Sequence, residues 1–360
     1  MKAAILEQIP GELVIDEVQV GSVGPHEVLV RTAAAGLCHS DLHFMEGKYP
    51  APVPTVMGHE SAGVVEAVGS QVSYVQPGDH VISCISGFCG ACRYCLSGRP
   101  NLCDRVGLAA DPARPPRLRR GDETIFQFAD LSSFAEQLLV HENLLVKIRP
   151  DMPLDKAALI GCGVTTGVGA VINTAQVRPG DDVVVIGCGG IGLNAIQAAA
   201  IVGAGRVIAV DRVVSKLDLA KTFGATDVVD ASAVDPVLAV FELTGDGVDH
   251  AFEAIGLAAT AQQAFSMLRK GGTATVIGMI PLGERIEVDG FQFLMEKRIQ
   301  GSNMGSNRFR VDMPQYIEWY FAGKLKLDEL VSGTMPLEQI NEGFANLKAG
   351  EVARQLILFD

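Results

Sequence analysis

Aromatic side chains are scarce in this 360-residue sequence, at 6% of the chain, whereas hydrophobic residues as a whole reach 48%. The hydrophobic core must therefore be built mainly from aliphatic side chains. Basic residues are also outnumbered: 29 lysines and arginines stand against 42 aspartates and glutamates, which gives a net charge of −13. This charge argues against nucleic acid and against an anionic membrane surface as partners.

A long uninterrupted apolar run is missing as well. The N-terminal stretch MKAAILEQIPGELVIDE reaches charged residues early, so it predicts a pair of strands and no signal peptide. The most apolar segment, residues 183–205, is interrupted by clustered glycines, which favours a strand, a turn and a helix over a membrane span. We therefore expect a cytoplasmic protein with reduced thiols, in which grouped cysteines indicate a metal site.

Half of the eight cysteines lie in one short stretch with the spacing C-x2-C-x2-C-x7-C: Cys89, Cys92, Cys95 and Cys103. Four thiolates that converge in a tight loop satisfy tetrahedral Zn²⁺ and leave no position for a substrate, so the spacing favours a structural zinc site. An iron–sulfur cluster is the main alternative, although its bacterial motif ends with a shorter gap and a proline. Unrelated buried thiols are the other alternative.

A catalytic zinc ion needs three protein ligands and one open position, and Cys38, His59 and Cys162 are candidates for those ligands. Spacing alone does not connect these residues, because they lie far apart in the sequence. Taken singly, each cysteine is more often a buried thiol, and a lone histidine is more often structural.

The segments around these residues show a specific resemblance. GHESAGVVEAVG (58–69) is followed by VQPGDHV (75–81), by the four-cysteine loop and, at the end, by GEVARQLILF (350–359). In these motifs the chain resembles the zinc-containing medium-chain alcohol dehydrogenase family over essentially its whole length. It is most similar to the subgroup of liver-type alcohol dehydrogenases and thiol-dependent formaldehyde dehydrogenases.

The resemblance also implies roles for individual residues. It implies that Cys38, His59 and Cys162 hold a catalytic zinc ion, so that two zinc ions bind per chain. The other implied roles are Glu60 behind the metal, Asp41 orienting His59, Ser40 and His43 in a proton relay, and His39 facing the cofactor pyrophosphate. Zinc lowers the pKa of bound water from 15.7 to about 7 and acts similarly on an alcohol, and the relay would then carry the proton to the surface.

A dinucleotide site is predicted in the second half of the chain. Val183 to Ile186 form a buried strand, and Gly187, Gly189 and Gly192 follow in the pattern G-x-G-x-x-G at the start of a helix. A second strand ends in Asp211, 19 positions beyond Gly192, as expected for a carboxylate that binds ribose hydroxyls. The context makes a glycine turn without a ligand the weaker explanation.

The acidic residue favours NAD, because it would repel the 2′-phosphate of NADP. Arg212 works against this preference, since NADP enzymes place arginine nearby. The resemblance also places Lys216 beside the adenosine ribose and Arg354 near the pyrophosphate. The remaining predicted cofactor contacts are Thr166, Gly190, Ile191, Ile255 and Ile277.

Further strand and helix patterns predict an α/β fold in which an open parallel sheet of about six strands forms a Rossmann domain. The N-terminal part has short β-runs, and for it the resemblance implies the family's partly open β-barrel (GroES-like) catalytic domain. The expected division is 1–163 catalytic domain, 164–303 NAD-binding domain and 304–360 return to the catalytic domain. Residues 285–305 lie where family members pair edge to edge, so a homodimer is expected.

The substrate is the least determined feature. By family position the channel is lined by Tyr49, Ile85, Leu108 and Phe128, a mostly apolar set that favours aliphatic or aromatic primary alcohols. Residues 111–123 carry four arginines and many prolines, and they predict a solvated surface loop and not an anion site.

Two alternatives remain. One is a thiol-dependent formaldehyde dehydrogenase that uses mycothiol in preference to glutathione, because the family's arginine near Gly107 and its carboxylate near Tyr49 are missing here; Arg105 could replace that contact. The other is a sensor that binds a dinucleotide without turnover.

Overall fold

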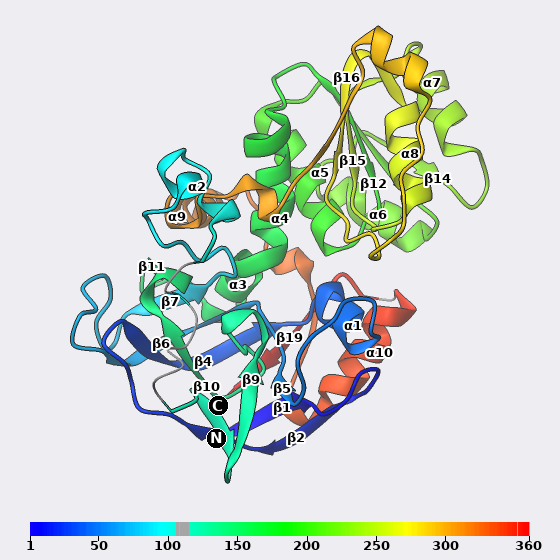
Figure 1. The fold of residues 1–360 in the computed structure, drawn as a ribbon. Helices are drawn as coiled ribbons and strands as arrows, with labels where there is room; N and C mark the ends of the chain where they lie inside the picture. The colour runs from blue at the N-terminus through cyan, green and yellow to red at the C-terminus, as the bar shows by residue number, and fades with distance from the viewer. Residues whose placement is uncertain (106–107, 109–114, 351, 360) are drawn as a thin grey trace. The chain divides into compact units, whose positions relative to one another are not determined.

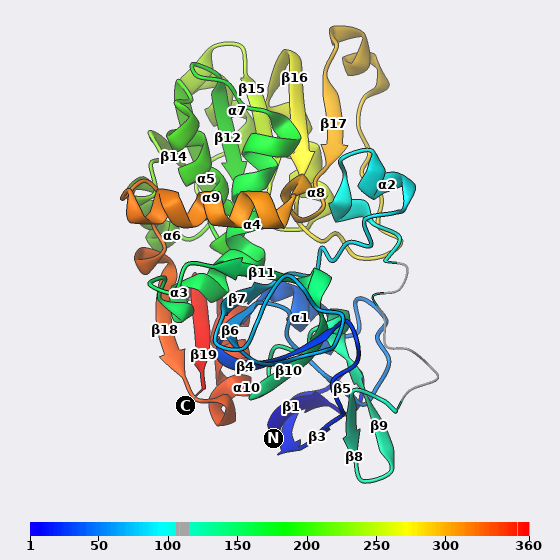
Figure 2. The ribbon, with the colours of Figure 1, turned by 90° about the vertical axis from the view of Figure 1, so that its left-hand side faces the viewer.

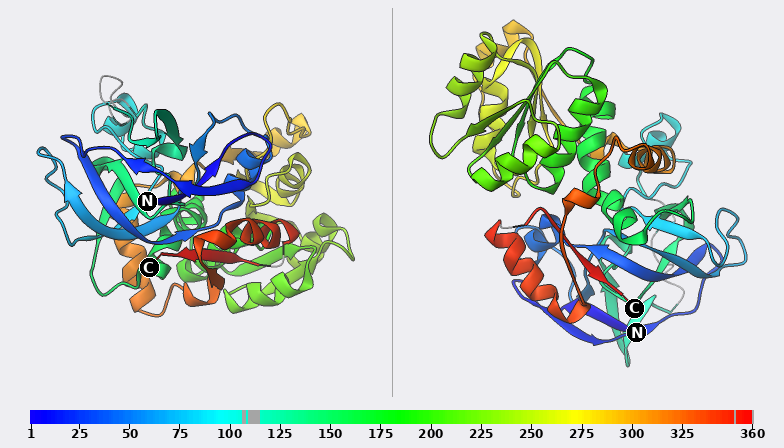
Figure 3. Two further views of the ribbon diagram at one scale, coloured as in Figure 1. Left: turned by 90° about the horizontal axis from the view of Figure 1, so that it is seen from below. Right: turned by 180° about the vertical axis from the view of Figure 1, so that it is seen from behind.

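The computed structural model describes residues 1–105, 108, 115–350 and 352–359. The chain divides into two compact units. The first unit comprises Met1–Cys162, Arg308–Tyr320 and Leu327–Asp360, and the second comprises Gly163–Asn307 and Phe321–Lys326. The predicted boundaries at 163/164 and 303/304 lie one and four residues from these divisions. Both chain ends lie in the first unit (Figure 3).

The first unit is built on two mostly antiparallel sheets (Figure 1). The smaller sheet has the order β2-β1-β5-β9-β8-β3: Leu13–Glu17, Lys2–Leu6, Thr55–Val56, Glu123–Gln127, Leu118–Arg120 and Gln19–Val20. The larger sheet has the order β11-β7-β6-β4-β19-β18, with β10 (Gln137–His141) also paired to β4: Leu145–Ile148, His80–Ser83, Ser61–Val68, Glu27–Gly36, Arg354–Leu358 and Val331–Met335. The C-terminal strand β19 thus completes a sheet that the N-terminal segment began.

The helices of the first unit are α1 (His39–Met45), α2 (Arg93–Leu96), α3 (Leu154–Leu159), α10 (Ile340–Ala349) and α9 (Phe309–Phe321), of which the last residue falls in the second unit. Alternating aliphatic residues of the strands fill the core of the first unit, in which Val28, Val30, Val65 and Val81 pack together. Helix α10 adds Phe344, which meets Phe134 edge to face.

The second unit contains one parallel sheet with helices on both faces (Figure 2). Its order is β14-β13-β12-β15-β16-β17: Asp227–Asp230, Arg206–Asp211, Asp182–Ile186, Val248–Glu253, Leu268–Val276 and Arg298–Gly301. Its helices are α4 (Thr165–Gly169), α5 (Gly190–Val202), α6 (Val214–Thr222), α7 (Pro236–Thr244) and α8 (Ala258–Ser266). In order of appearance the strands run 3-2-1-4-5-6, which is the order of dinucleotide-binding sheets.

One helical run, Leu154–Ala175, is long and apolar enough to cross a membrane by composition, but 83% of the relevant window is buried inside the protein. In this run the π-helical segment η4 (Ile160–Val164) joins α3 to α4, and a second π-helical segment, η5 (Ala170–Ala175), follows α4. A buried core helix passes the same test, so the run is weak evidence for a membrane span.

The arginine-rich stretch corrects one expectation. Residues 111–114 lie outside the described part of the chain, but residues 118–120 form strand β8 and not a solvated loop. Arg117 is only 5% exposed, and its Nε lies 2.7 Å from Glu27 Oε1. Its Nη2 also donates to the carbonyl of Leu108 at 3.2 Å. A buried arginine needs such partners, and nothing in the local sequence identifies a glutamate 90 residues away.

Candidate zinc and dinucleotide sites

The three residues proposed as catalytic zinc ligands come from separate elements of the first unit. Cys38 is the N-cap residue of α1 at the end of β4, and His59 lies between β5 and β6. Cys162 sits in the π-helical segment η4. Such wide turns inside α-helices occur frequently at functional sites.

The tertiary fold brings these side chains together. One Sγ or ring nitrogen from each lies within 4.8 Å of the others, and His59 Nε2 is 3.3 Å from Cys162 Sγ. All three residues are at most 4% exposed. Two thiols and one imidazole fit zinc, and three ligands leave a position for water or substrate.

Asp41 orients the imidazole from behind. Its Oδ1 lies 3.0 Å from His59 Nδ1, and the residue is 0% exposed. Burial raises the pKa of Asp41. A carboxylate at Nδ1 keeps the proton on that nitrogen and leaves Nε2 free for a metal, which is the usual arrangement for a ligating histidine.

Glu60 and Arg354 form a buried ion pair near this cluster. Glu60 is 0% exposed, and a Cβ on Gly36 would come within 2.3 Å of its Oε1, so any larger residue at position 36 would displace this carboxylate. Arg354 Nη1 lies 3.5 Å from Glu60 Oε2 and donates to the carbonyl of Leu37 at 3.1 Å. The arginine is thus held inside the first unit, and its expected contact with the cofactor pyrophosphate stays a prediction.

The relay candidates share helix α1. The Cys38 thiol donates to Ser40 Oγ at 3.6 Å, which places the hydroxyl beside the proposed zinc ligands. His43 lies one helical turn further along, so both side chains are on one face. Its Nδ1 is buried without a hydrogen-bond partner among the described residues, and its ring stacks on Tyr49 with centroids 6.3 Å apart. His39, at the start of the helix, is exposed.

Aromatic rings form a wall next to His59. Phe128 meets the His59 ring edge to face at 5.9 Å and the Phe44 ring at 4.8 Å, and Phe44 contacts Tyr49 at 5.6 Å. The sequence prediction had included Tyr49 and Phe128 but missed Phe44, whose only signal was its place directly after His43.

Of the other two predicted channel residues, Leu108 is buried and Ile85 is half-buried. Leu108 is 1% exposed, and its Cδ1 lies 3.0 Å from the position that a Cβ on Gly87 would take. Ile85 packs against the valine-rich core cluster. Phe44 and Phe128 pack against a different hydrophobic cluster from the one that Ile85 contacts.

The four-cysteine loop forms a second possible metal site. The Sγ atoms of Cys89, Cys92, Cys95 and Cys103 lie within 4.8 Å of one another. Backbone N–H groups point at them: Cys92 N donates to Cys89 Sγ at 3.3 Å, and Cys89 N donates to Cys103 Sγ at 3.2 Å. The amides of Cys95 and Asp104 lower the pKa of Cys92 to about 6, whereas burial raises the pKa values of Cys95 and Cys103. The donor set fits structural zinc.

The glycine turn of the second unit is shaped to receive a pyrophosphate. Gly187 has φ +98°, and a Cβ on Gly192 would lie 1.7 Å from its carbonyl oxygen. A Cβ on Gly189 would meet nothing within 4 Å, so space remains above the turn. Gly189 is also the N-cap of α5 and offers no capping side chain, so the first N–H groups of the helix, which begins with Gly190 and Ile191, can bind an anion.

Asp211 ends β13 beside this turn. Its carboxylate accepts backbone N–H groups from Cys188 at 2.8 Å, Arg212 at 2.7 Å and Val213 at 3.0 Å. The residue therefore supports the turn in addition to its expected contact with ribose. Arg212 is exposed and Lys216 is half-buried on the first turn of α6.

Glu253 is a buried residue that sequence reasoning missed. Its Oε1 accepts from the N–H groups of Ile255 at 2.9 Å and Gly256 at 2.7 Å, and its carbonyl accepts from Ile277 N at 2.9 Å. It thereby ties together the two loops that carry the predicted cofactor contacts Ile255 and Ile277. Thr166, another predicted contact, donates to Met304 Sδ at 3.3 Å within the same unit.

The second unit has a parallel sheet with a glycine turn suited to a pyrophosphate, and the first unit has a buried set of two cysteines and one histidine. Together these two features define a zinc-dependent dehydrogenase. Two family models match the chain: the alcohol dehydrogenase GroES-like domain over residues 24–151 and the zinc-binding dehydrogenase over residues 190–322. The chain belongs to the zinc-containing medium-chain alcohol dehydrogenase family, and the predicted family and fold class are confirmed.

Two relatives show the breadth of this similarity. Alcohol dehydrogenase 1 of Pisum sativum is 36% identical, and the alignment covers 99% of this chain and 96% of that protein. The S-(hydroxymethyl)glutathione dehydrogenase of Haemophilus influenzae is 39% identical, with 96% and 93% covered.

Solved structures agree with the sequence matches. An alcohol dehydrogenase zinc-binding domain protein from Burkholderia ambifaria has a TM-score of 0.95 at 37% identity, covering 100% of this chain and 98% of that one. Benzyl alcohol dehydrogenase from Acinetobacter calcoaceticus has a TM-score of 0.94 at 34% identity, with 100% and 99% covered. A zinc-binding dehydrogenase from Sinorhizobium meliloti, solved with NADP, has a TM-score of 0.83 at 28% identity and covers 99% of each chain. Together with the two cysteine-rich clusters, these matches support zinc and NAD(P) as cofactors.

Proposed function

We propose that this chain is a zinc-dependent, NAD-linked alcohol dehydrogenase that interconverts primary alcohols and aldehydes by hydride transfer. The buried set of Cys38, His59 and Cys162, with Asp41 behind the imidazole, carries this proposal. In this family of enzymes such a set has one open position, where an alcohol is activated.

Zinc at this set would lower the pKa of an alcohol on the open position, so that a hydride can leave its carbon for the nicotinamide. The chain's own residues do the remaining work. Asp41 fixes the His59 ring, Ser40 lies at the ligands to accept the alcohol proton, and His43 receives it at the far end of the relay. Burial of the set excludes bulk water and strengthens each of these electrostatic contacts.

His43 should give alcohol oxidation a characteristic pH dependence. Burial lowers the pKa of His43 below its usual 6.5; Lys48 lowers it further, whereas Glu46 and Cys38 oppose the shift. The imidazole is therefore neutral at pH 7 and able to accept a proton, and this capacity is lost as the pH falls through the lowered pKa. We expect His43→Gln to reduce kcat/KM for alcohol oxidation at pH 7 by about 10-fold or more, with recovery toward pH 9.

The matched control is His26→Gln, which removes a half-exposed imidazole paired with Glu142 in the same unit. The control profile should follow that of the wild type. If kcat/KM depends on pH in the same way in His43→Gln and in wild type, His43 does not take part in the proton relay.

The aromatic wall of Phe44, Tyr49 and Phe128 favours alcohols with an apolar or aromatic group. The similarity to a benzyl alcohol dehydrogenase supports this choice. The similarity to an S-(hydroxymethyl)glutathione dehydrogenase keeps a thiol adduct of formaldehyde as the second candidate. Arg105, the residue that could contact such an adduct, is already ion-paired with Asp130 at 2.5 Å, which counts against that candidate.

A substrate panel tests the proposal directly. NADH formation is followed with ethanol, octanol and benzyl alcohol, and with formaldehyde alone, with glutathione and with mycothiol. We expect alcohols to turn over without a thiol. If only a thiol adduct of formaldehyde is oxidised, that adduct replaces primary alcohols as the assigned substrate. If no substrate of the panel gives NADH, the result favours a protein that binds a dinucleotide without turnover.

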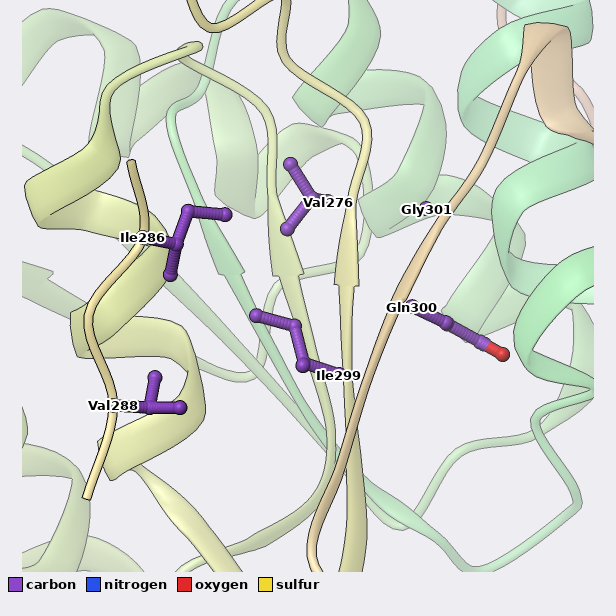
Figure 4. A pocket seen from close by; sticks show the side chains of 6 residues that line it. All are labelled: Val276, Ile286, Val288, Ile299, Gln300 and Gly301. Atoms are coloured by element: carbon purple, nitrogen blue, oxygen red, sulfur yellow. The ribbon is translucent and has the colours of Figure 1, made fainter. Parts of the chain in front are cut away.

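We further propose a cytoplasmic homodimer that pairs through β17. This strand is at the end of the described sheet order, and an apolar groove of about 320 Å³ lies beside it (Figure 4). The groove is lined by Val276, Ile286, Val288, Ile299, Gln300 and Gly301, and Phe291 and Leu294 are 61% and 74% exposed nearby in sequence. An edge strand has unpaired backbone groups, and together with exposed apolar residues it favours pairing with a second chain. Sedimentation at twice the 38.1 kDa chain mass is the expected result.

A further inference from the structure

Arg105 connects three segments of the first unit. It follows the four-cysteine loop by two residues, and its backbone N–H donates to Cys103 Sγ at 3.1 Å. Its Nη1 donates to the carbonyl of Ile85 at 2.8 Å. Its Nη2 donates to Asp130 Oδ2 at 2.5 Å and to the carbonyl of Ala129 at 3.4 Å. One side chain therefore bonds to the backbone of Ile85 and to the segment that follows Phe128, two residues that the sequence predicts to line the substrate channel.

The segment that Arg105 holds has an unfavourable backbone. Ala129 has φ +53°, Asp130 φ +60° and Ser132 φ +64°, a region that residues other than glycine rarely adopt. Such conformations persist where surrounding contacts over-determine them. The Arg105 and Asp130 side chains are 32% and 30% exposed, so their charge-assisted bonds are only partly screened by solvent.

Phe128 stands directly before this segment. Its ring is the one that contacts both Phe44 and His59 in the aromatic wall. The backbone N–H groups of Leu131 and Ser132 donate back to its carbonyl at 2.9 and 3.1 Å, which closes a tight turn. The position of the Phe128 ring thus depends on the turn, and the turn is held by Arg105.

We propose that Arg105 is a positioning residue that couples the four-cysteine loop to the substrate wall, and that it determines how well bulky alcohols bind relative to small ones. The proposal rests on the proposed alcohol dehydrogenase function. In this arrangement the four-cysteine loop anchors the backbone of an arginine whose side chain holds the turn next to Phe128.

The test compares Arg105→Ala, Arg105→Lys and Asp130→Asn with wild type, and uses Arg149→Ala as the matched control. Arg149 also forms a two-nitrogen ion pair, with Asp151 at 2.6 Å, is 39% exposed and pairs with Glu318 at 3.0 Å, so it is a similar paired arginine elsewhere in the first unit. For Arg105→Ala we expect KM for benzyl alcohol to rise by about 10-fold, with kcat for ethanol and the Kd of NADH changed by less than about twofold. Arg105→Lys should recover part of the loss, because lysine reaches one partner and not all three.

A readout independent of activity is amide hydrogen exchange in a peptide that covers residues 126–134. Arg105→Ala and Asp130→Asn should both speed exchange at Leu131 and Ser132, and Arg149→Ala should not. Unchanged exchange in both variants, or an equal loss for ethanol and benzyl alcohol, would overturn the proposal. If wild type oxidises no alcohol, the proposed function fails, whereas the exchange experiment still decides whether Arg105 holds the turn.

Discussion

Replacing Cys38 with serine is expected to lower kcat for alcohol oxidation by at least about 1000-fold while the Kd of NADH stays within about twofold. The reason is that the alcohol must lose its proton before the hydride can leave, and zinc held by Cys38, His59 and Cys162 would supply that acidity. Metal analysis should give two zinc ions per wild-type chain and one in the variant, because the four-cysteine loop is untouched.

Cys84→Ser is the matched control. Cys84 is buried in the first unit and belongs to neither cysteine cluster of the described chain. Burial raises the pKa of Cys84 to about 11, so it remains a thiol at neutral pH. This variant should keep two zinc ions and its turnover. A Cys38→Ser protein with two zinc ions, or with wild-type kcat, would show that the catalytic metal is held elsewhere.

Replacing Asp211 with glycine is expected to shift the ratio of kcat/KM for NAD over NADP toward NADP by about 30-fold, or ~2 kcal/mol. The carboxylate would accept hydrogen bonds from the ribose of NAD and repel the 2′-phosphate of NADP. The structure adds a second effect. The same carboxylate holds the N–H groups of Cys188, Arg212 and Val213, so kcat/KM for NAD itself should fall as the turn loosens.

The control for this change is Asp230→Gly. Asp230 is the register partner of Asp211 on the neighbouring strand β14, and it too accepts a backbone N–H, from Ser232 at 2.8 Å. Asp230 thus offers the same carboxylate and a similar hydrogen bond to the backbone, but it does not follow the strand next to the glycine turn. An unchanged cofactor ratio for Asp211→Gly, or an equal shift in Asp230→Gly, would mean that Arg212 or another residue selects the cofactor.

The sequence prediction succeeded where the pattern is local and failed where partners are remote. The strand, glycine turn and helix of residues 183–205 follow from short-range periodicity and from glycine chemistry, and the structure shows this arrangement. Residues 111–123 looked like a solvated loop because arginine and proline are usually exposed. Arg117 is instead buried against Glu27, a partner that no local pattern indicates.

By itself the sequence determined the four-cysteine loop and the dinucleotide turn, because their groups lie within a few residues of one another and short spacing restricts where the chain can place them. Only the tertiary structure brought Cys38, His59 and Cys162 to within 4.8 Å, since a strand, a turn and a π-helical segment far apart in the chain must first pack into one unit. The same holds for Arg105, whose bonds to Ile85 and Asp130 cross 20 and 25 residues. Long-range contacts depend on how whole elements pack, and that information is not contained in any single segment.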